Sequence, residues 1–167
     1  MSSEMPIGPS GPTTYNLLFV CTGNTCRSPL AEAIASEAIR TREWKHVRAE
    51  SAGTAAAAGA PASPAAISVA GEHGIDLTLH RSRVLSPELI EWADLVLAMG
   101  PSHLLAAVEM GAGEKAAMLT EFLDGESLGA AIEDPFGGDV EAYRESYSQI
   151  ASAIDALLGR LEPILAP

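Results

Sequence analysis

Residues 17–29 read LLFVCTGNTCRSP, an apolar run that leads into a short polar loop and a proline. The run 17–20 has the length and the apolar character of a strand buried on both faces. Pro29 predicts that a helix begins beside it, because the first helical turn does not need the N–H that proline lacks. Cys21 is therefore expected at the end of a strand, and Arg27 at the start of a helix.

The loop between this strand and this helix has the residues of an anion-binding site. Backbone N–H groups at a helix N-terminus converge on an anion, and the helix dipole favours negative charge there. Gly23 lets the backbone curl without a Cβ, and the planar guanidinium of Arg27 can hold two phosphate oxygens. The same surroundings favour the thiolate form of Cys21, to which Ser28 can donate a hydrogen bond. We therefore expect Cys21 to attack a phosphoryl group held by Thr22, Gly23, Asn24, Thr25, Cys26, Arg27 and Ser28.

A nucleophile that attacks phosphorus usually needs an acid to protonate the leaving group. The best candidate is Asp134, in the stretch IEDPFGG at residues 132–138. The proline after the aspartate favours an extended turn, and the two glycines let the segment fold over a pocket. Taken alone, the segment is more typical of an ordinary Asp-Pro turn, so its assignment depends on the cysteine loop.

Strands and helices alternate along the chain. This alternation predicts an α/β protein with a parallel sheet covered by helices on both faces. Such sheets bind ligands at the carboxyl ends of their strands, which is where Cys21 lies. The expected strands are 16–20, 47–50, 94–99 and 116–119, and the expected helices are 28–42, 64–73, a short one from 86, 101–109 and 139–161, with 122–133 mostly loop.

Composition and charge exclude several classes of protein. The length of 167 residues predicts one domain over 15–167, after a flexible Pro- and Gly-rich tail at 1–14. Only ten Lys and Arg oppose 22 Asp and Glu. The resulting net charge of −12 argues against a nucleic-acid partner, which needs clustered basic residues. An acidic surface resists self-association, so a monomer is expected.

The sequence also predicts where the protein works. No apolar run reaches the roughly 18 residues of a membrane span, and residues 1–14 lack the apolar core of a signal peptide. Two cysteines are too few for a disulfide-built secreted scaffold. We therefore expect a cytoplasmic protein without a membrane partner. No metal or cofactor is expected, since His46, His73 and His103 lack metal-ligand spacing, and His103 is assigned no role.

Together these motifs resemble the low-molecular-weight protein tyrosine phosphatase family. The resemblance spans about residues 15–161. It implies the family's three-layer fold with a four-stranded parallel sheet, a cysteinyl-phosphate intermediate and no metal. The matching stretches are CTGNTCRSP at 21–29, SAG at 51–53, HRSR at 80–83, ADLVLAM at 93–99 and DP at 134–135.

The family pattern implies a role for each matching residue. Cys21 corresponds to the nucleophile and Arg27 to the clamp on the phosphate and the transition state. Asp134 corresponds to the general acid, and then to the base for the water that clears the phosphocysteine. From the residues alone, Ser51 and His80 fit turn and surface positions equally well. The positions that match the family's loop-bracing residues are Asn24, Ser28, Ser51 and His80.

Two departures from the phosphotyrosine enzymes bear on the substrate. Those enzymes tend to carry a bulky aliphatic residue where this chain has Thr25, and aromatic walls where this chain has Phe136 followed by two glycines. Both features look like the bacterial protein-arginine phosphatases of the family, in which the threonine is taken to select phosphoarginine. A hydroxyl suits a polar guanidinium, whereas a large aliphatic side chain suits an aromatic ring. We therefore expect phosphoarginine on proteins as the substrate, with Thr25 and Phe136 setting selectivity.

Several alternatives stay open. The nearest is a protein-tyrosine phosphatase with the same mechanism. Arsenate reduction on the same fold resembles enzymes that use further cysteines, which this chain lacks beyond Cys26. A non-catalytic phosphate-binding module is disfavoured by the presence of Cys21, Arg27 and Asp134. Cys26 is either a small apolar residue under the loop or the partner of Cys21 in a reversible disulfide that spares the nucleophile from over-oxidation.

Overall fold

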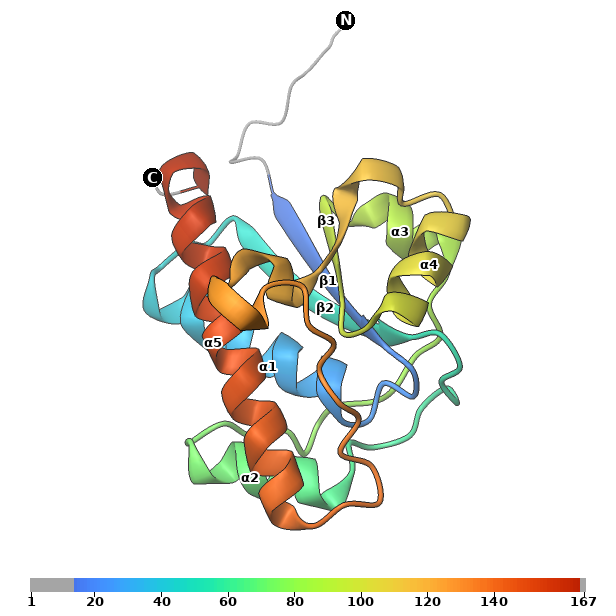
Figure 1. The fold of residues 1–167 in the computed structure, drawn as a ribbon, viewed down its shortest axis with the longest axis vertical. Coiled ribbons are helices and arrows are strands. Elements are labelled where there is room, and N and C mark those ends of the chain that lie inside the picture. The colour runs from blue at the N-terminus through green and yellow to red at the C-terminus, as the bar shows by residue number, and fades with distance from the viewer. Residues whose placement is uncertain (1–13, 166–167) are drawn as a thin grey trace, which may run out of the picture.

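A four-stranded parallel sheet organises the computed structural model, which describes residues 14–165. The strand order is β2-β1-β3-β4, and helices cover both faces of the sheet (Figure 1). The expected three-layer α/β fold is confirmed, whereas all but the last residue of the expected tail at 1–14 lies outside the described residues. The strands are β1 (Tyr15–Cys21), β2 (Val47–Gly53), β3 (Leu95–Ala98) and β4 (Ala116–Met118). The helices are α1 (Arg27–Thr41), α2 (Pro64–Glu72), α3 (Pro87–Trp92), α4 (Pro101–Glu109) and α5 (Val140–Leu165), with short 3-10 turns η1 (Gly113–Lys115), η2 (Leu119–Phe122) and η3 (Gly125–Ser127).

The central strand β1 supplies side chains to a hydrophobic cluster on each face of the sheet. Successive residues of a strand point to opposite faces. Leu17 and Phe19 pack with α1, α2 and α5, whereas Leu18 and Val20 pack with α3 and α4. All four side chains are fully buried. The apolar run quoted first is therefore the strand around which both outer layers are built.

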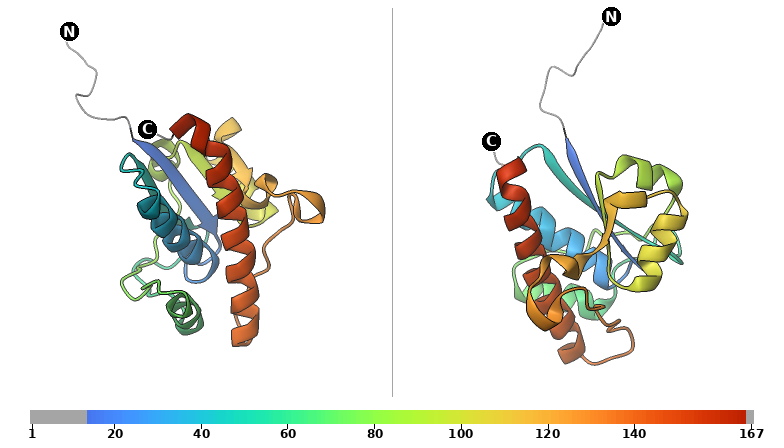
Figure 2. Two further views of the ribbon diagram at one scale, coloured as in Figure 1. Left: turned by 90° about the vertical axis from the view of Figure 1, so that its left-hand side faces the viewer. Right: turned by 45° about the horizontal axis from the view of Figure 1, so that its top comes forward.

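Figure 2 shows how the layers lie in space, with α5 running along α1 and α2 on one side of the sheet. Helices α2 and α3 begin at a serine cap. Ser63 accepts a hydrogen bond from the N–H of Ala66, and Ser86 accepts one from the N–H of Leu89, with proline next in each case. Gly74 follows α2 with a φ of +76°, the left-handed conformation that ends many helices.

Several predicted boundaries were wrong by one to four residues. Strand β2 continues past the expected end at residue 50, because it pairs with β1 until Cys21 lies opposite Gly53. Strands β3 and β4 are shorter than 94–99 and 116–119. Helix α5 extends beyond residue 161 through Pro163, since buried Leu165 still packs on the core. The segment 122–133 begins with the last residue of η2 and contains η3, and the rest of it is loop.

The strand order indicates which edge of the sheet is expected to bind a ligand. Strand β1 lies between β2 and β3, so the chain leaves β1 at the point where the sheet's winding direction changes. Doubly wound sheets bind their ligands at the carboxyl ends of strands at such a point. The loop after β1 and the start of α4 after β3 therefore meet at this edge. None of the helices described within residues 14–165 is long and apolar enough to cross a membrane.

Candidate active site

The loop after β1 is shaped by one left-handed residue and by one glycine on the neighbouring strand. Asn24 has a φ of +56°, a conformation that asparagine tolerates better than most residues. Gly53 on β2 lies directly behind the loop. A Cβ on Gly53 would lie 2.4 Å from the carbonyl oxygen of Thr22 and 2.9 Å from the backbone nitrogen of Asn24. The loop therefore curls against a position where only glycine fits.

Asn24 is the residue that fixes the loop's shape. Its side chain is fully buried, and its Nδ2 donates to Ser28 Oγ at 2.8 Å and to Ser51 Oγ at 3.0 Å. Its Oδ1 accepts from the N–H of Arg83 at 2.9 Å. Its backbone oxygen lies 2.7 Å from His80 Nε2. Because a carbonyl oxygen only accepts hydrogen bonds, His80 carries a proton on Nε2 and donates it. Burial lowers the pKa of His80 below its ordinary value.

The cysteine at the start of the loop has a hydroxyl beside it. Cys21 Sγ lies 2.9 Å from Ser28 Oγ, and both residues are buried. Further hydrogen bonds lead from Ser28 through Asn24 to Ser51, whose hydroxyl donates to Glu32 Oε1 at 2.6 Å. Burial raises the pKa of Glu32, partly offset by that hydrogen bond. The thiol therefore lies at one end of a chain of hydrogen-bonded side chains that ends at a carboxyl group, in the order Cys21, Ser28, Asn24, Ser51 and Glu32.

Arg27, the first residue of α1, faces the same space as the cysteine. Its Nη1 donates to the carbonyl oxygen of Ile132 at 3.0 Å, and its Nη2 lies 3.6 Å from Asp134 Oδ2. Its Nε is buried and has no hydrogen-bond partner among residues 14–165. A buried donor without a partner is unusual, and an anion is the partner that a guanidinium prefers. The guanidinium is thus held on one side and has donors free on the other.

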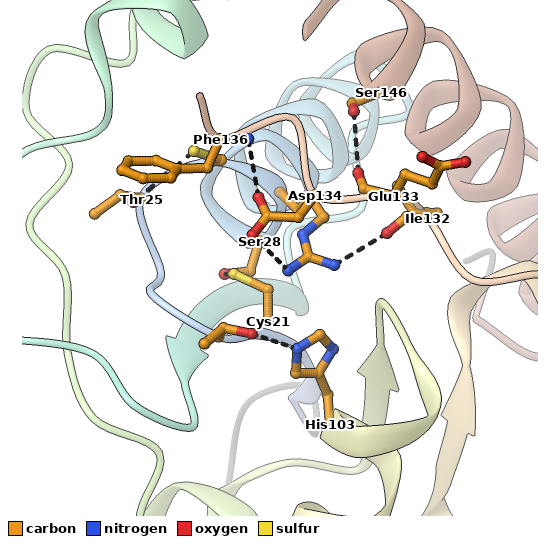
Figure 3. Close-up of polar contacts among 12 residues, drawn as sticks. Cys21, Thr25, Ser28, His103, Ile132, Glu133, Asp134, Phe136 and Ser146 are labelled. Carbon is orange, nitrogen blue, oxygen red and sulfur yellow. Dashed lines mark hydrogen bonds and ion pairs between the residues drawn. The ribbon is translucent and has the colours of Figure 1, made fainter. Parts of the chain in front are cut away.

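Asp134 reaches the loop because its segment is tied to the end of β3. The N–H of Ile132 donates to the carbonyl oxygen of Met99 at 2.9 Å. Since Arg27 holds the carbonyl group of the same residue, Ile132 is fixed from two sides. Beyond it, the N–H of Phe136 donates to Asp134 Oδ1 at 3.1 Å. These contacts bring a carboxylate more than a hundred positions away in sequence to the edge of the cysteine loop (Figure 3).

The residues meet around a cavity of about 220 Å³. Larger cavities occur elsewhere, but this one contains the cysteine and the arginine. Phe136 is 74% exposed and stands at its mouth, and half-buried Thr25 lies on the same wall. Ser51 and His80 lie outside this lining and contact the loop from behind. The residues around the cavity are Cys21, Thr22, Gly23, Thr25, Cys26, Arg27, Asp134 and Phe136.

Cys26 combines features of both interpretations offered from the sequence. It is buried, and its Sγ lies 3.4 Å from Ser63 Oγ and 3.5 Å from the Tyr143 hydroxyl. It also borders the same cavity as Cys21, and both cysteines are free thiols. The role of this pair under oxidising conditions stays a prediction.

No role was expected for His103, yet the residue lies beside the cysteine loop. Its Nε2 is 2.8 Å from Thr22 Oγ1. One signal was available, because His103 lies in the first turn of the helix that follows the buried strand β3 and is therefore near the carboxyl edge of the sheet. The carbonyl oxygen of Ile132 was also missed, since a backbone atom carries no signal in the sequence.

Comparisons with known proteins agree with this geometry. Residues 16–164 match the family model for low molecular weight phosphotyrosine protein phosphatase. A protein-arginine-phosphatase of Geobacillus stearothermophilus is 41% identical, over 89% of this chain and 97% of that protein. A probable low molecular weight protein-tyrosine-phosphatase, EpsP of Ralstonia solanacearum, is 34% identical, over 89% of this chain and 97% of that protein.

The fold also matches that of a solved structure. It is a cysteine-to-serine mutant of the YwlE arginine phosphatase with a phosphorylated active-site serine. This chain is 36% identical to it, with a TM-score of 0.80 over 88% of this chain and 95% of that one. The family match spans nearly the whole length, and the relatives are aligned over nearly all of theirs. The chain therefore belongs to the low molecular weight phosphotyrosine protein phosphatase family and is a cysteine-dependent protein phosphatase.

Proposed function

We propose that this protein removes phosphate from phosphoarginine residues of other proteins, with Cys21 as nucleophile, Arg27 as phosphate clamp and Asp134 as acid and base. The observation that carries the phosphatase chemistry is the buried Nε of Arg27, which has no partner in the described chain; Arg27 itself borders the cavity of Cys21. A phosphoryl oxygen supplies the acceptor that this donor lacks. Nε and Nη2 are adjacent donors, so the guanidinium can donate two parallel hydrogen bonds to two oxygens of a phosphoryl group.

The first step transfers the phosphoryl group to the enzyme. The thiolate of Cys21 attacks phosphorus, the S–P bond forms, and the P–N bond to the arginine side chain breaks. Asp134 gives its proton to the leaving nitrogen, so the arginine departs as a guanidinium. The hydroxyl of Ser28, 2.9 Å from the sulfur, donates to the thiolate before attack. Donors around the phosphoryl oxygens stabilise the charge of the transition state.

The second step clears the enzyme. A water molecule attacks phosphorus, and the carboxylate of Asp134 accepts its proton. The S–P bond breaks, inorganic phosphate forms, and Cys21 returns as a thiolate. The same residue serves as acid and then as base because the two steps are chemically the reverse of one another at phosphorus. Asp134 Oδ2 lies 3.6 Å from Arg27 Nη2 at the edge of the cavity, near both the leaving nitrogen of the first step and the water of the second.

Substrate choice is assigned to the wall that contains Thr25 and Phe136. A phosphoarginine side chain brings N–H donors into the site, whereas a phosphotyrosine ring brings none. Thr25 Oγ1 makes a contact of 3.9 Å with Cys26 Sγ, and Asp134 adds a carboxylate acceptor at the mouth. A site that offers acceptors binds a polar guanidinium better than an apolar ring. The similarity to a protein named protein-arginine-phosphatase supports the same choice.

The test compares one peptide sequence that carries either phosphoarginine or phosphotyrosine. We expect kcat/KM to favour phosphoarginine by at least about tenfold, the scale of one hydrogen bond. Thr25→Ile should move the preference toward phosphotyrosine, and Thr25→Ser, which keeps the hydroxyl, should leave it unchanged. A wild-type preference for phosphotyrosine would show that the protein is a tyrosine phosphatase with the same chemistry. Release of phosphate from neither peptide would contradict both activities.

A further inference from the structure

We propose that His103 is a positioning residue for the phosphate loop. It holds the hydroxyl of Thr22, the residue next to the nucleophile, and so keeps the first turn of the loop in its phosphate-binding shape. The proposal rests on the phosphatase chemistry assigned to Cys21 and does not depend on which phosphorylated residue is the substrate. It adds a contact from α4 to a loop whose known supports come from β2 and the segment before α3.

The geometry is that of a buried ring against an exposed side chain. His103 is 4% exposed and lies in the first turn of α4, where its N–H donates to the carbonyl oxygen of Gly100 at 3.1 Å. Its Nε2 lies 2.8 Å from Thr22 Oγ1, although the two residues are 81 positions apart. Figure 3 shows the ring of His103 beside Cys21, with a dashed line marking this hydrogen bond.

Thr22 is held from two sides. Its carbonyl oxygen accepts from the N–H of Ala55 at 2.9 Å, and its hydroxyl meets His103. Without the second contact, an exposed residue directly after Cys21 would keep only a backbone anchor. The N–H groups that face a phosphoryl group belong to this turn, so a change in its angle moves the donors. Catalytic donors displaced by about 1 Å lose much of their effect.

The His103 ring is seated against the backbone of its own turn. Gly100 lies under it, so that a Cβ at that position would be 3.5 Å from Nδ1 and 3.7 Å from Cε1. Burial, and to a smaller extent the positive charge of Arg27, lower the pKa of His103 to about 4, while the charge of Asp134 opposes the shift. The ring is therefore neutral at physiological pH and carries one proton.

The position of that proton decides what Thr22 can do. Nδ1 of His103 is buried and has no partner in the part of the chain that the structure describes. A buried N–H without an acceptor is rarer than a buried acceptor without a donor, so the proton belongs on Nε2. His103 then donates to Thr22 Oγ1. The O–H of Thr22 stays free to donate toward the cavity that Thr22 borders.

The experiment measures three quantities in four variants: His103→Ala, His103→Gln, Thr22→Val and the double variant His103→Ala/Thr22→Val. The quantities are kcat/KM for p-nitrophenyl phosphate and, by calorimetry, the Kd and stoichiometry of inorganic phosphate. His46→Ala is the matched control, because His46 precedes β2 at the opposite end of the sheet from the loop.

His103→Ala and Thr22→Val should each weaken phosphate binding and lower kcat/KM by about tenfold, the factor for one net hydrogen bond. The double variant should lose no more than either single variant, because His103 acts through Thr22. His103→Gln, whose amide can place an N–H near the position of Nε2, should recover most of the loss. The stoichiometry of phosphate should stay at one per chain, whereas partial unfolding would lower it.

Losses that multiply in the double variant, or an unchanged phosphate Kd in His103→Ala, would overturn the proposal. If His103→Ala fails to fold, Thr22→Val decides, since it changes an exposed side chain; wild-type behaviour there would overturn the proposal as well. A wild-type protein that favours phosphotyrosine peptides contradicts only the proposed substrate. A wild-type protein that neither hydrolyses p-nitrophenyl phosphate nor binds phosphate contradicts the phosphatase chemistry and this proposal together.

Discussion

Single residues in this protein act through neighbours that sequence patterns do not reveal. The motif around Cys21 predicted a phosphate loop because its residue types carry the chemistry directly. Ser51 and His80 drew support from the family resemblance alone, and their contacts with Asn24 depend on strands and loops that meet only in the fold. His103 belongs to the same kind of residue. A histidine after a strand is common, and only the neighbouring position of β1 gives it a partner.

Gly53→Ala tests the closest approach in the site. The added Cβ would meet two backbone atoms of the loop, at 2.4 and 2.9 Å, and backbone yields less easily than a side chain. We expect unfolding free energy to fall by about 2 kcal/mol, the usual size of an overpacking effect, and kcat/KM to fall at least about tenfold. Urea unfolding and a p-nitrophenyl phosphate assay measure the two effects.

Gly71→Ala is the control for that substitution. Gly71 lies within α2, and apart from its chain neighbours and the backbone of its own helix no described atom lies within 4 Å of its Cβ position. Alanine is favoured over glycine in a helix by about 0.5–1 kcal/mol, so this variant should be as stable as the parent or more so. Wild-type activity in Gly53→Ala would show that the loop tolerates a shift of its backbone.

The lowered pKa of His103 predicts a pH-dependent contribution to stability. The ordinary value is 6.5 and the folded value is about 4, so the unfolded chain binds the extra proton more readily between these limits. The contribution to unfolding free energy is therefore complete above pH 6.5 and is lost as the pH falls toward 4. About 3 kcal/mol is expected to be lost by pH 4, since the two pKa values differ by about 2.5 and each pKa unit corresponds to about 1.4 kcal/mol.

Urea unfolding of the parent and of His103→Gln between pH 7.5 and pH 4 isolates this contribution. His80, whose pKa is also lowered, is present in both proteins and cancels in the difference. The free energy of unfolding of the parent should fall relative to that of His103→Gln as the pH falls. A difference that is the same at every pH would mean that His103 titrates as an ordinary histidine.

Among the elements, the turn after Asp134 has the most demanding geometry. The N–H of Gly138 donates to the carbonyl oxygen of Pro135 at 2.8 Å, and Gly137 between them has a φ of +82°. A turn with a positive φ at its third residue strongly favours glycine there. The sequence predicted that the two glycines let this segment fold over a pocket, and Asp134 and Phe136 do line the cavity. The hydrogen bond from Ile132 to Met99 that orients the segment has no signal in the sequence.

Gly137→Ala should disturb this turn and leave the phosphate loop unchanged. Placing alanine at positive φ costs about 1 kcal/mol, and the turn relieves that strain by moving Asp134. We expect kcat for a phosphoarginine peptide to fall several-fold, whereas the Kd of inorganic phosphate stays unchanged. Gly111→Ala, at a φ of +104° beyond the far end of α4, carries comparable strain away from the site and should keep full activity. Weaker phosphate binding in Gly137→Ala would mean that the turn also shapes the loop.

At the scale of the whole molecule, alternating strands and helices predicted the layers but not the order of the strands. Periodicity reports which faces of an element are buried, and strand neighbours depend on packing between elements far apart in the chain. Boundaries were wrong for the same reason. Strand β2 continues to Gly53 because β1 continues beside it, and Ser51 to Gly53 show no strand pattern of their own.

The net charge of −12 predicts how salt affects different substrates. An acidic protein repels an acidic phosphopeptide and attracts a basic one, and salt screens both effects. Raising ionic strength from about 0.05 M to about 0.5 M should raise kcat/KM for a peptide with acidic flanks and lower it for one with basic flanks, each several-fold. A peptide with uncharged flanks is the control. Equal responses of the acidic and basic peptides would show that the net charge of the protein does not affect the electrostatic potential at the site.

The hydrogen bond between Arg27 and Ile132 joins residues 105 positions apart. During synthesis the cysteine loop leaves the ribosome long before the segment that carries Ile132 and Asp134. Until that segment has been made, Arg27 lacks the carbonyl group of Ile132, and the proposed acid Asp134 is absent. On the proposed roles, we therefore expect a partly made chain to have little phosphatase activity until nearly the whole domain has been synthesised.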